Sequence, residues 1–249
     1  MWLYERPITH RGLHNKSISE NSLNAYKNSI EHNYNIEIDV HLLKSGEIVV
    51  FHDFTLTRMC KKNVKISNLT LADIKSDEYL LPDGQHIPLL SEVLELINGK
   101  TGLLIELKLA LFSYKLENEL LKQIKGKEDW IAIQAFNPLT VIWYRKHAPE
   151  FERGILSSNI VFPITMLAFK KMQPTFASYD IKNANNPRLH KLMEKYKSNM
   201  LTWTINSEDK VNKSIEYKSN NIIFENIDLD EIGFDNTKIT TPKYQHTSK

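Results

Sequence analysis

The sequence lacks several features that would indicate particular classes of protein. Its 249 residues include one cysteine, Cys60, so no internal disulfide can form and a small disulfide-stapled fold is excluded. The net charge is only +2, and no basic run is longer than a pair such as Lys61-Lys62. Composition therefore gives no indication of nucleic acid binding. With only eight glycines, the chain also has no glycine-rich dinucleotide-binding fingerprint.

Long apolar runs are missing as well. No segment is long and apolar enough to span a bilayer, and residues 1–7 do not join a basic region to an apolar run as a secretory signal does. We therefore expect a cytoplasmic protein without stable membrane insertion. Gly99-Lys100-Thr101 resembles the end of a phosphate-binding P-loop, but Leu94 stands where that motif needs glycine. The triplet also precedes a strand rather than a helix, so this interpretation is rejected.

What the sequence does contain is a regular alternation of apolar runs with stretches of helical period. Strand-helix alternation over the whole chain favours a parallel sheet with crossover helices. The expected strands are 7–10, 35–40, 48–52, 102–107, 130–135, 153–156, 175–179, 200–205 and 221–224. The expected helices are 22–32, 91–97, 114–124, 139–147, 161–171, 187–196 and 207–218.

Nine expected strands exceed the eight that a TIM barrel needs. Residues 38–43 and 48–52 are separated by four residues that include Gly46, which suits a hairpin and is too short for a crossover helix. Eight barrel strands then remain, and we predict a single TIM (β/α)₈ domain over residues 1–249. Residues 54–88 form a small insertion after strand two, with a short helix near 71–76 that begins at Thr70 and Asp73. Residues 235–249 form a polar tail.

Charged residues at alternate positions end the second and third expected barrel strands. Glu37 and Asp39 point to the same face of one strand, and Glu106 with Lys108 repeats the spacing. At the carboxyl ends of barrel strands, where function resides, three carboxylates would repel one another without a cation. Oxygen ligands suit Mg²⁺ or Ca²⁺. The alternative is that these are interior residues paired with Lys108 and Arg11, but the two histidines nearby favour a metal site.

Two of the nine histidines have a context that indicates catalysis. His10 ends the first strand and is followed by Arg11-Gly12, whereas His52 ends an apolar run and precedes Asp53, a possible orienting carboxylate. Two histidines around one phosphate form an acid-base pair near neutral pH. We expect packing or surface roles for the other seven, which are His14, His32, His41, His86, His147, His190 and His246.

A series of short motifs follows one another along the chain. They are His10-Arg11-Gly12, Glu20-Asn21, Glu37-Ile38-Asp39-Val40, Lys44-Ser45-Gly46, Val49-Val50-Phe51-His52-Asp53, residues 87–94, Glu106-Leu107-Lys108, Gln134-Ala135-Phe136 and Trp203-Thr204-Ile205-Asn206. No single motif is specific, but in this order, over roughly residues 8–226, they resemble the glycerophosphodiester phosphodiesterase family.

The resemblance implies a role for each matching residue. It implies that one divalent ion is held by Glu37, Asp39 and Glu106, and that His10 and His52 are catalytic. The implied reaction is attack by a substrate hydroxyl on phosphorus through a cyclic phosphate, which water then opens. The residues implied to bind substrate are Arg11 and Lys108 at the phosphate, Trp203 at the glycerol side, and Asn21, Gln134 and Phe136.

The chain departs from the family after the last strand. Many members have a Thr-Asp-Tyr-Pro-like run there, where this sequence reads Phe224-Glu225-Asn226-Ile227. Glu225 would stand in for the aspartate with a side chain one methylene longer. We expect this change to affect the wall of the site on that side, and with it the choice of substrate.

Three functions fit these observations. The first is metal-dependent hydrolysis of small-molecule glycerophosphodiesters to sn-glycerol 3-phosphate and an alcohol. The second is a lipid phosphodiesterase, either a lysophospholipase D or an enzyme like phosphatidylinositol phospholipase C. It would need an exposed apolar rim on the βα loops, of which residues 55–62 offer little. The third is a binding module without catalysis, which would lack one of His10, His52, Glu37, Asp39 and Glu106, yet all five are present.

Overall fold

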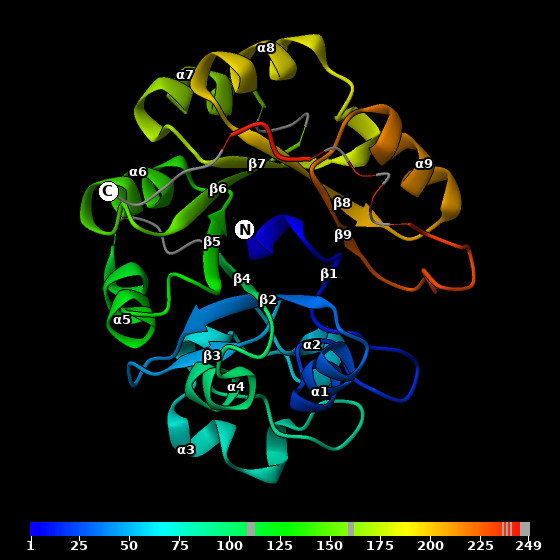
Figure 1. Cartoon of the computed structure of the whole chain (residues 1–249). Helices are drawn as coiled ribbons and strands as arrows, with labels where there is room; N and C mark the ends of the chain where they lie inside the picture. The colour runs from blue at the N-terminus through cyan, green and yellow to red at the C-terminus, as the bar shows by residue number, and fades with distance from the viewer. Residues whose placement is uncertain (109–112, 159–161, 236, 238, 240, 245–249) are drawn as a thin grey trace.

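Eight parallel strands close into a ring in the computed structural model, which describes residues 1–108, 113–158, 162–235, 237, 239 and 241–244. The first strand pairs with both the second and the last, which completes the barrel that Figure 1 shows end-on. This architecture confirms the predicted TIM barrel. The barrel strands are β1 (Ile8–Thr9), β2 (Asn35–Leu42), β4 (Leu103–Leu107), β5 (Ile131–Ala135), β6 (Glu152–Ser157), β7 (Phe176–Asp180), β8 (Asn199–Ile205) and β9 (Asn221–Phe224).

Helices surround this ring, and several begin at a capping residue visible in the sequence. The Ser22 side chain accepts a hydrogen bond from the backbone N–H of Ala25 at the start of α1. Asn137 and Asn186 cap α6 and α8, each followed directly by proline. The outer helices are α1 (Leu23–Glu31), α4 (Leu90–Ile97), α5 (Lys115–Ile124), α6 (Pro138–His147), α7 (Phe162–Met172), α8 (Pro187–Tyr196) and α9 (Glu208–Glu216), and a 3₁₀ turn, η4 (Ile181–Asn183), precedes α8.

The extra strand forms the predicted hairpin. β3 (Ile48–Val50) runs antiparallel to the end of β2, with Val40 opposite Val50, and Gly46 takes a φ of 107° in the turn. The insertion that follows has its own small core, which includes Phe51, Leu56 and Ile66. It carries α2 (Thr57–Cys60), η2 (Ile66–Asn68), α3 (Leu71–Ile74) and η3 (Asp77–Tyr79).

The predicted short helix of the insertion is α3, and its capping box is complete. Thr70 accepts from the backbone of Asp73, while the Asp73 carboxylate accepts from the backbone N–H of Thr70. Aspartate therefore replaces the usual glutamate of this motif without loss of either hydrogen bond.

A 3₁₀ turn at the N-terminus, η1 (Trp2–Tyr4), closes the amino-terminal end of the barrel, an element that the sequence did not predict. Figure 1 shows it inside the ring. Leu3 is fully buried, and the Asn221 side chain donates a 2.7 Å hydrogen bond to its carbonyl. The Trp2 ring packs on Gly102, where a Cβ would lie 1.8 Å from Trp2 Cε3. With this end filled, the opposite end of the barrel remains for a ligand.

Part of the C-terminal tail docks on the barrel. The Asn220 side chain donates to the carbonyl of Thr241, and the Asn199 side chain donates to that of Tyr244. Other tail residues, His246 among them, and residue 161, the first of the expected helix 161–171, lie outside the described ranges. Within those ranges, no helix combines the length and apolarity that crossing a bilayer requires.

Candidate active site

A cavity of about 190 Å³ opens at the carboxyl ends of the strands. A hollow of about 430 Å³ lies elsewhere, between the ends of α8 and α9, but the groups that could carry out chemistry gather in the smaller cavity. Nine of the eleven predicted site residues line it. The lining consists of His10, Arg11, Glu37, His52, Glu106, Lys108, Gln134, Phe136, Leu156, Trp203, Thr204 and Ile223.

Three buried carboxylates converge at the floor of this site. Glu37 and Asp39 alternate along β2, and the parallel register places Asp39 opposite Glu106 on β4. One oxygen from each lies within 4.8 Å of the others, and the three residues are between 0% and 7% exposed. The two alternating motifs therefore meet as the sequence predicted, in a geometry that could hold a metal ion.

Two cationic side chains contact these carboxylates. Lys108 Nζ lies 2.7 Å from Asp39 Oδ1 and 2.5 Å from Glu106 Oε1, and Arg11 Nε lies 3.5 Å from Asp39 Oδ2. The backbone N–H of Arg11 donates to Glu37 Oε2 at 3.0 Å. Burial opposes ionisation of Asp39, but Lys108 and Arg11 outweigh it and hold its pKa below the usual range.

The negative charges of the other two carboxylates, Glu37 and Glu106, are not fully balanced by the nearby cations. Burial, together with the charge of Asp39, raises the pKa of Glu106 to about 7 and that of Glu37 well above its ordinary value. Gln134, opposite Glu106 in the sheet, is 1% exposed, and its Oε1 has no hydrogen-bond partner within the described residues. A set of oxygen donors with excess negative charge fits a hard divalent cation.

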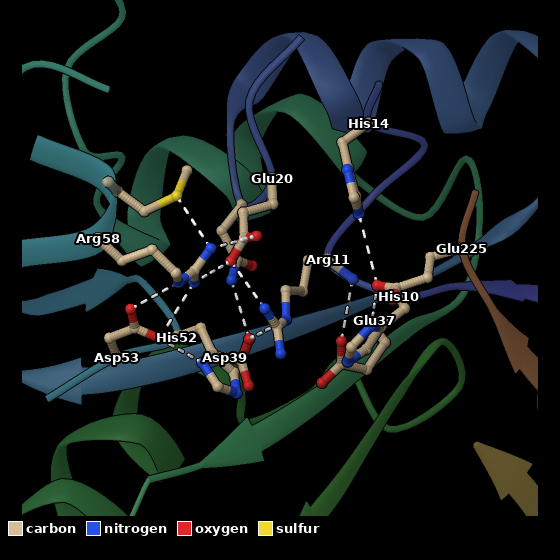
Figure 2. Close-up of polar contacts among 12 residues, drawn as sticks. His10, Arg11, His14, Glu20, Glu37, Asp39, His52, Asp53, Arg58 and Glu225 are labelled. Atoms are coloured by element: carbon tan, nitrogen blue, oxygen red, sulfur yellow. Dashed lines mark hydrogen bonds and ion pairs between the residues drawn. The ribbon is translucent and has the colours of Figure 1, made fainter. Parts of the chain in front are cut away.

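Each catalytic histidine candidate has its Nδ1 held by a carboxylate (Figure 2). His52 Nδ1 lies 2.7 Å from Asp53 Oδ1, which confirms the expected orienting partner. His10 Nδ1 lies 2.6 Å from Glu225 Oε2. With Nδ1 donating to a carboxylate, Nε2 is the ring nitrogen left to exchange a proton with a ligand. Burial lowers the pKa of His52, which favours the neutral imidazole that a general base requires.

Glu225 has a more specific position than the sequence predicted. Instead of forming only a wall of the site, its carboxylate lies beside the His10 ring, and His14 Nε2 lies 3.7 Å from the same oxygen. Burial opposes its ionisation, but the hydrogen bond from His10 and the proximity of His14 hold the Glu225 pKa well below its usual range. His14 thus lies at the edge of the site. His41 lies within the hairpin, on β2, where it is buried and its Nε2 is 3.2 Å from the His52 carbonyl.

Asn21 lies apart from the cavity lining, in contact with the buried Asp39 carboxylate. It is 1% exposed, donates a 2.9 Å hydrogen bond to Asp39 Oδ2, and accepts one from the Tyr26 hydroxyl. The structure therefore places it where it orients Asp39 rather than where it would contact substrate. The two predicted aromatic residues line the cavity mouth, with the Phe136 and Trp203 rings packed edge to face at 5.9 Å.

Glu20 and Arg58 belong to the same polar network, although the sequence assigned no role to either. Arg58, from α2 of the insertion, binds both Glu20 and Asp53, and Arg11 donates to Glu20 (Figure 2). Glu20 could have been noticed, because it stands beside Asn21 in one of the quoted motifs. Arg58 carried no comparable signal, since its partner Glu20 lies 38 residues away in the chain.

Comparison with known proteins agrees with this geometry. Residues 10–229 match the Glycerophosphoryl diester phosphodiesterase family. A glycerophosphodiester phosphodiesterase of Caldanaerobacter subterraneus is 35% identical over 159 residues, which cover 60% of this chain and 65% of that protein, just under two thirds of its length. One from Bacillus altitudinis is 27% identical over 165 residues, covering 62% of this chain and 67% of that protein.

Solved structures show the same fold. The glycerophosphodiester phosphodiesterase of Thermotoga maritima superposes with a TM-score of 0.75 at 23% identity, covering 92% of this chain and 99% of that one. A phosphodiesterase of Oleispira antarctica, solved in complex with the product sn-glycerol-3-phosphate, superposes with a TM-score of 0.77 at 22% identity, covering 90% of this chain and 94% of that one. Because the family match extends from the first catalytic histidine candidate past the last barrel strand, this chain belongs to the glycerophosphoryl diester phosphodiesterase family.

Proposed function

We propose that this protein hydrolyses glycerophosphodiesters to sn-glycerol 3-phosphate and an alcohol. The observation that carries the proposal is the pair of carboxylate-held histidines, His10 and His52, which line one cavity with Arg11, Lys108 and the three buried carboxylates. Family membership supports the reaction class, and the Oleispira antarctica relative binds the same product.

In the proposed mechanism, the two histidines exchange protons with the substrate. One takes the proton from a glycerol hydroxyl as that oxygen attacks phosphorus, and the other protonates the alcohol oxygen as its bond to phosphorus breaks. The resulting cyclic phosphate is then opened by water, with the histidines exchanging roles. Acid-base catalysis of this kind contributes about 10²–10⁴ in rate. The Arg11 guanidinium and the Lys108 ammonium would bind the phosphate oxygens.

Glu37, Asp39 and Glu106 would hold one divalent ion, Mg²⁺ or Ca²⁺. When bound, it would supply positive charge that stabilises the phosphoryl oxygens. Asn21 would keep the Asp39 carboxylate in place through its 2.9 Å hydrogen bond. This arrangement also accounts for the burial of three acidic side chains whose charges Lys108 and Arg11 do not fully compensate.

The size and lining of the cavity favour a small polar substrate. Its volume of about 190 Å³ is below the usual range for ligand pockets, about 300–1,000 Å³, and suits a phosphate with its glycerol. Trp203 and Phe136 would cover the carbon face of the glycerol, and Gln134 offers a buried carbonyl oxygen for a hydroxyl.

Exposed apolar side chains on the same end of the barrel favour a second candidate, a lysophospholipase D or related lipid phosphodiesterase. Phe54 at the start of the insertion is 56% exposed, Phe136 is 37% exposed, and Leu139 in the first turn of α6 is 51% exposed. Residues 55–62 offered little sign of such a rim. An acyl chain could lie across these side chains while the phosphodiester occupies the cavity.

The experiment that tests the proposal is release of sn-glycerol 3-phosphate from glycerophosphocholine and glycerophosphoethanolamine, with Mg²⁺, with Ca²⁺ and with a chelator. Metal-dependent release that is lost in His10→Ala and Glu106→Ala would support it. Absence of release from both diesters under every condition would overturn it. Parallel assays with lysophosphatidylcholine distinguish the lipid candidate, which predicts a much higher kcat/KM for the acylated substrate.

A further inference from the structure

We propose that Arg58, which the insertion supplies, is a positioning residue that holds His52 and Arg11 in their working orientations. It would act through two carboxylates, Asp53 and Glu20, rather than by touching the substrate. The roles of His52 and Arg11 rest on the proposed function, whereas the contacts of Arg58 do not.

Arg58 makes a bidentate hydrogen bond to each carboxylate, using two nitrogens for each. Its Nε and Nη2 lie 2.8 and 3.0 Å from the two oxygens of Asp53. Its Nη1 and Nη2 lie 2.8 and 2.6 Å from the two oxygens of Glu20. Only a guanidinium can make two such forks at once, because its donors are fixed in one plane.

Each carboxylate is shared with a group that lines the cavity. Asp53 Oδ1, which accepts from Arg58, also lies 2.7 Å from His52 Nδ1. Glu20 Oε1, which accepts from Arg58, also accepts from Arg11 Nη1 at 2.8 Å. Charge-assisted hydrogen bonds therefore run without a break from the imidazole through Arg58 to the phosphate-binding guanidinium, as Figure 2 shows.

Neighbouring residues of the insertion fix the backbone around Arg58. Leu56, two residues earlier, is fully buried in the core of the insertion and accepts a backbone hydrogen bond from Cys60 across α2. The helix is followed by Lys61 in a left-handed conformation. The Lys61 ammonium donates a hydrogen bond to the Arg58 carbonyl. The Met59 sulfur accepts from Arg58 Nη1 at 3.1 Å. These contacts thus restrain both the backbone and the guanidinium of Arg58.

These contacts distinguish Arg58 from an ordinary surface ion pair. Its side chain is 46% exposed, and isolated ion pairs at that exposure contribute little to stability. Here, however, Glu20 and Asp53 are only 14% and 23% exposed and each binds a site residue. Without Arg58, both carboxylates could rotate, and His52 and Arg11 would lose their fixed orientation. The effect should therefore appear in catalysis rather than in folding.

Kinetics of Arg58→Ala and Arg58→Lys test this proposal, with Lys62→Met as the matched control. Lys62 lies in the same insertion and forms a comparable exposed ion pair with Glu78 at 3.4 Å, away from the site. We expect both Arg58 variants to lower kcat/KM by about 10²-fold, the usual scale for misplaced catalytic groups. Added guanidinium ion should partly restore Arg58→Ala, whereas ammonium should not. Lys62→Met should match the unsubstituted protein.

A second measurement does not depend on activity. In protein with ¹⁵N-labelled histidine at alkaline pH, long-range ¹H–¹⁵N spectra report which ring nitrogen of His52 is protonated, and His52→Gln assigns the signal. We expect Nδ1–H in the unsubstituted protein and a mixture of tautomers in Arg58→Ala.

An unchanged tautomer together with kcat/KM within twofold of the unsubstituted protein would overturn the proposal, as would full rescue by Arg58→Lys. If the protein hydrolyses no glycerophosphodiester, the tautomer shift alone decides whether Arg58 positions His52. Failure of the proposed function and failure of the positioning role are therefore separate results.

Discussion

Glu225 Oε2 lies 2.6 Å from His10 Nδ1, although the two residues are 215 positions apart. The contact exists because β9 lies beside β1, with Phe224 opposite Thr9 and the Phe224 carbonyl accepting from the His10 backbone. A carboxylate after the last strand therefore orients a histidine after the first. The arrangement matches that of Asp53 and His52, so both ends of the proposed acid-base pair are fixed in the same way.

We predict that Glu225→Gln lowers kcat by about 10²-fold or more, because an amide can donate to Nδ1 and stabilise the wrong tautomer of His10. Glu225→Asp keeps the negative charge on a shorter side chain, so its kcat should fall between those of the unsubstituted protein and Glu225→Gln. Steady-state kinetics with glycerophosphocholine measure both effects. Glu216→Gln, an exposed position on α9, is the control. Equal activity of Glu225→Gln and the unsubstituted protein would show that this contact has no catalytic role.

Divalent metal should stabilise the folded protein through Glu37, Asp39 and Glu106. Binding to the native state adds about 2.7 kcal/mol at a hundred times Kd, which for a chain of this length raises Tm by about 5–10 °C. Calorimetry with Mg²⁺, with Ca²⁺ and with chelator measures the shift. Glu37→Gln should abolish it. A shift that survives in Glu37→Gln would place the metal elsewhere.

His41 should make stability depend on pH. Burial lowers its pKa from 6.5 to about 4 in the folded protein, so the unfolded chain binds the proton more readily. Above about pH 6.5 His41 is neutral in both states and the folded protein has its full stability. As the pH is lowered from 6.5 to about 4, the free energy of unfolding should fall by on the order of 3 kcal/mol. Urea unfolding at several pH values measures this slope. His41→Gln should flatten it, and an unchanged slope would assign the pH dependence to other groups.

Gly102→Ala should destabilise the turn that closes the barrel, because the new methyl would overlap the Trp2 ring. Overpacking of this kind costs about 1–3 kcal/mol. Urea unfolding of Gly102→Ala, Trp2→Ala and the double variant forms a thermodynamic cycle, in which the double variant should lose less stability than the sum of the two. Strict additivity would mean that the two residues do not pack together in solution.

Several features could be predicted from the sequence because they depend on local spacing. Alternation along β2 and β4 puts Glu37, Asp39, Glu106 and Lys108 on inward-facing positions, and the short spacing around Gly46 requires a hairpin. Strand-helix alternation and the count of eight strands led to the barrel, and the barrel to a site at the carboxyl ends of its strands. The meeting of the three carboxylates thus followed from periodicity together with one topological rule.

Other features were decided only by tertiary structure, because they join segments that no local pattern relates. Closure of the ring brought Glu225 to His10, and folding of the insertion brought Arg58 between Glu20 and Asp53. Asn21 appeared from its motif to be a substrate ligand, but burial places it behind Asp39. Spacing along the chain determines which face a side chain occupies. The partner that it meets depends on which distant segments pack together, and here that packing completed the hydrogen bonds around both histidines.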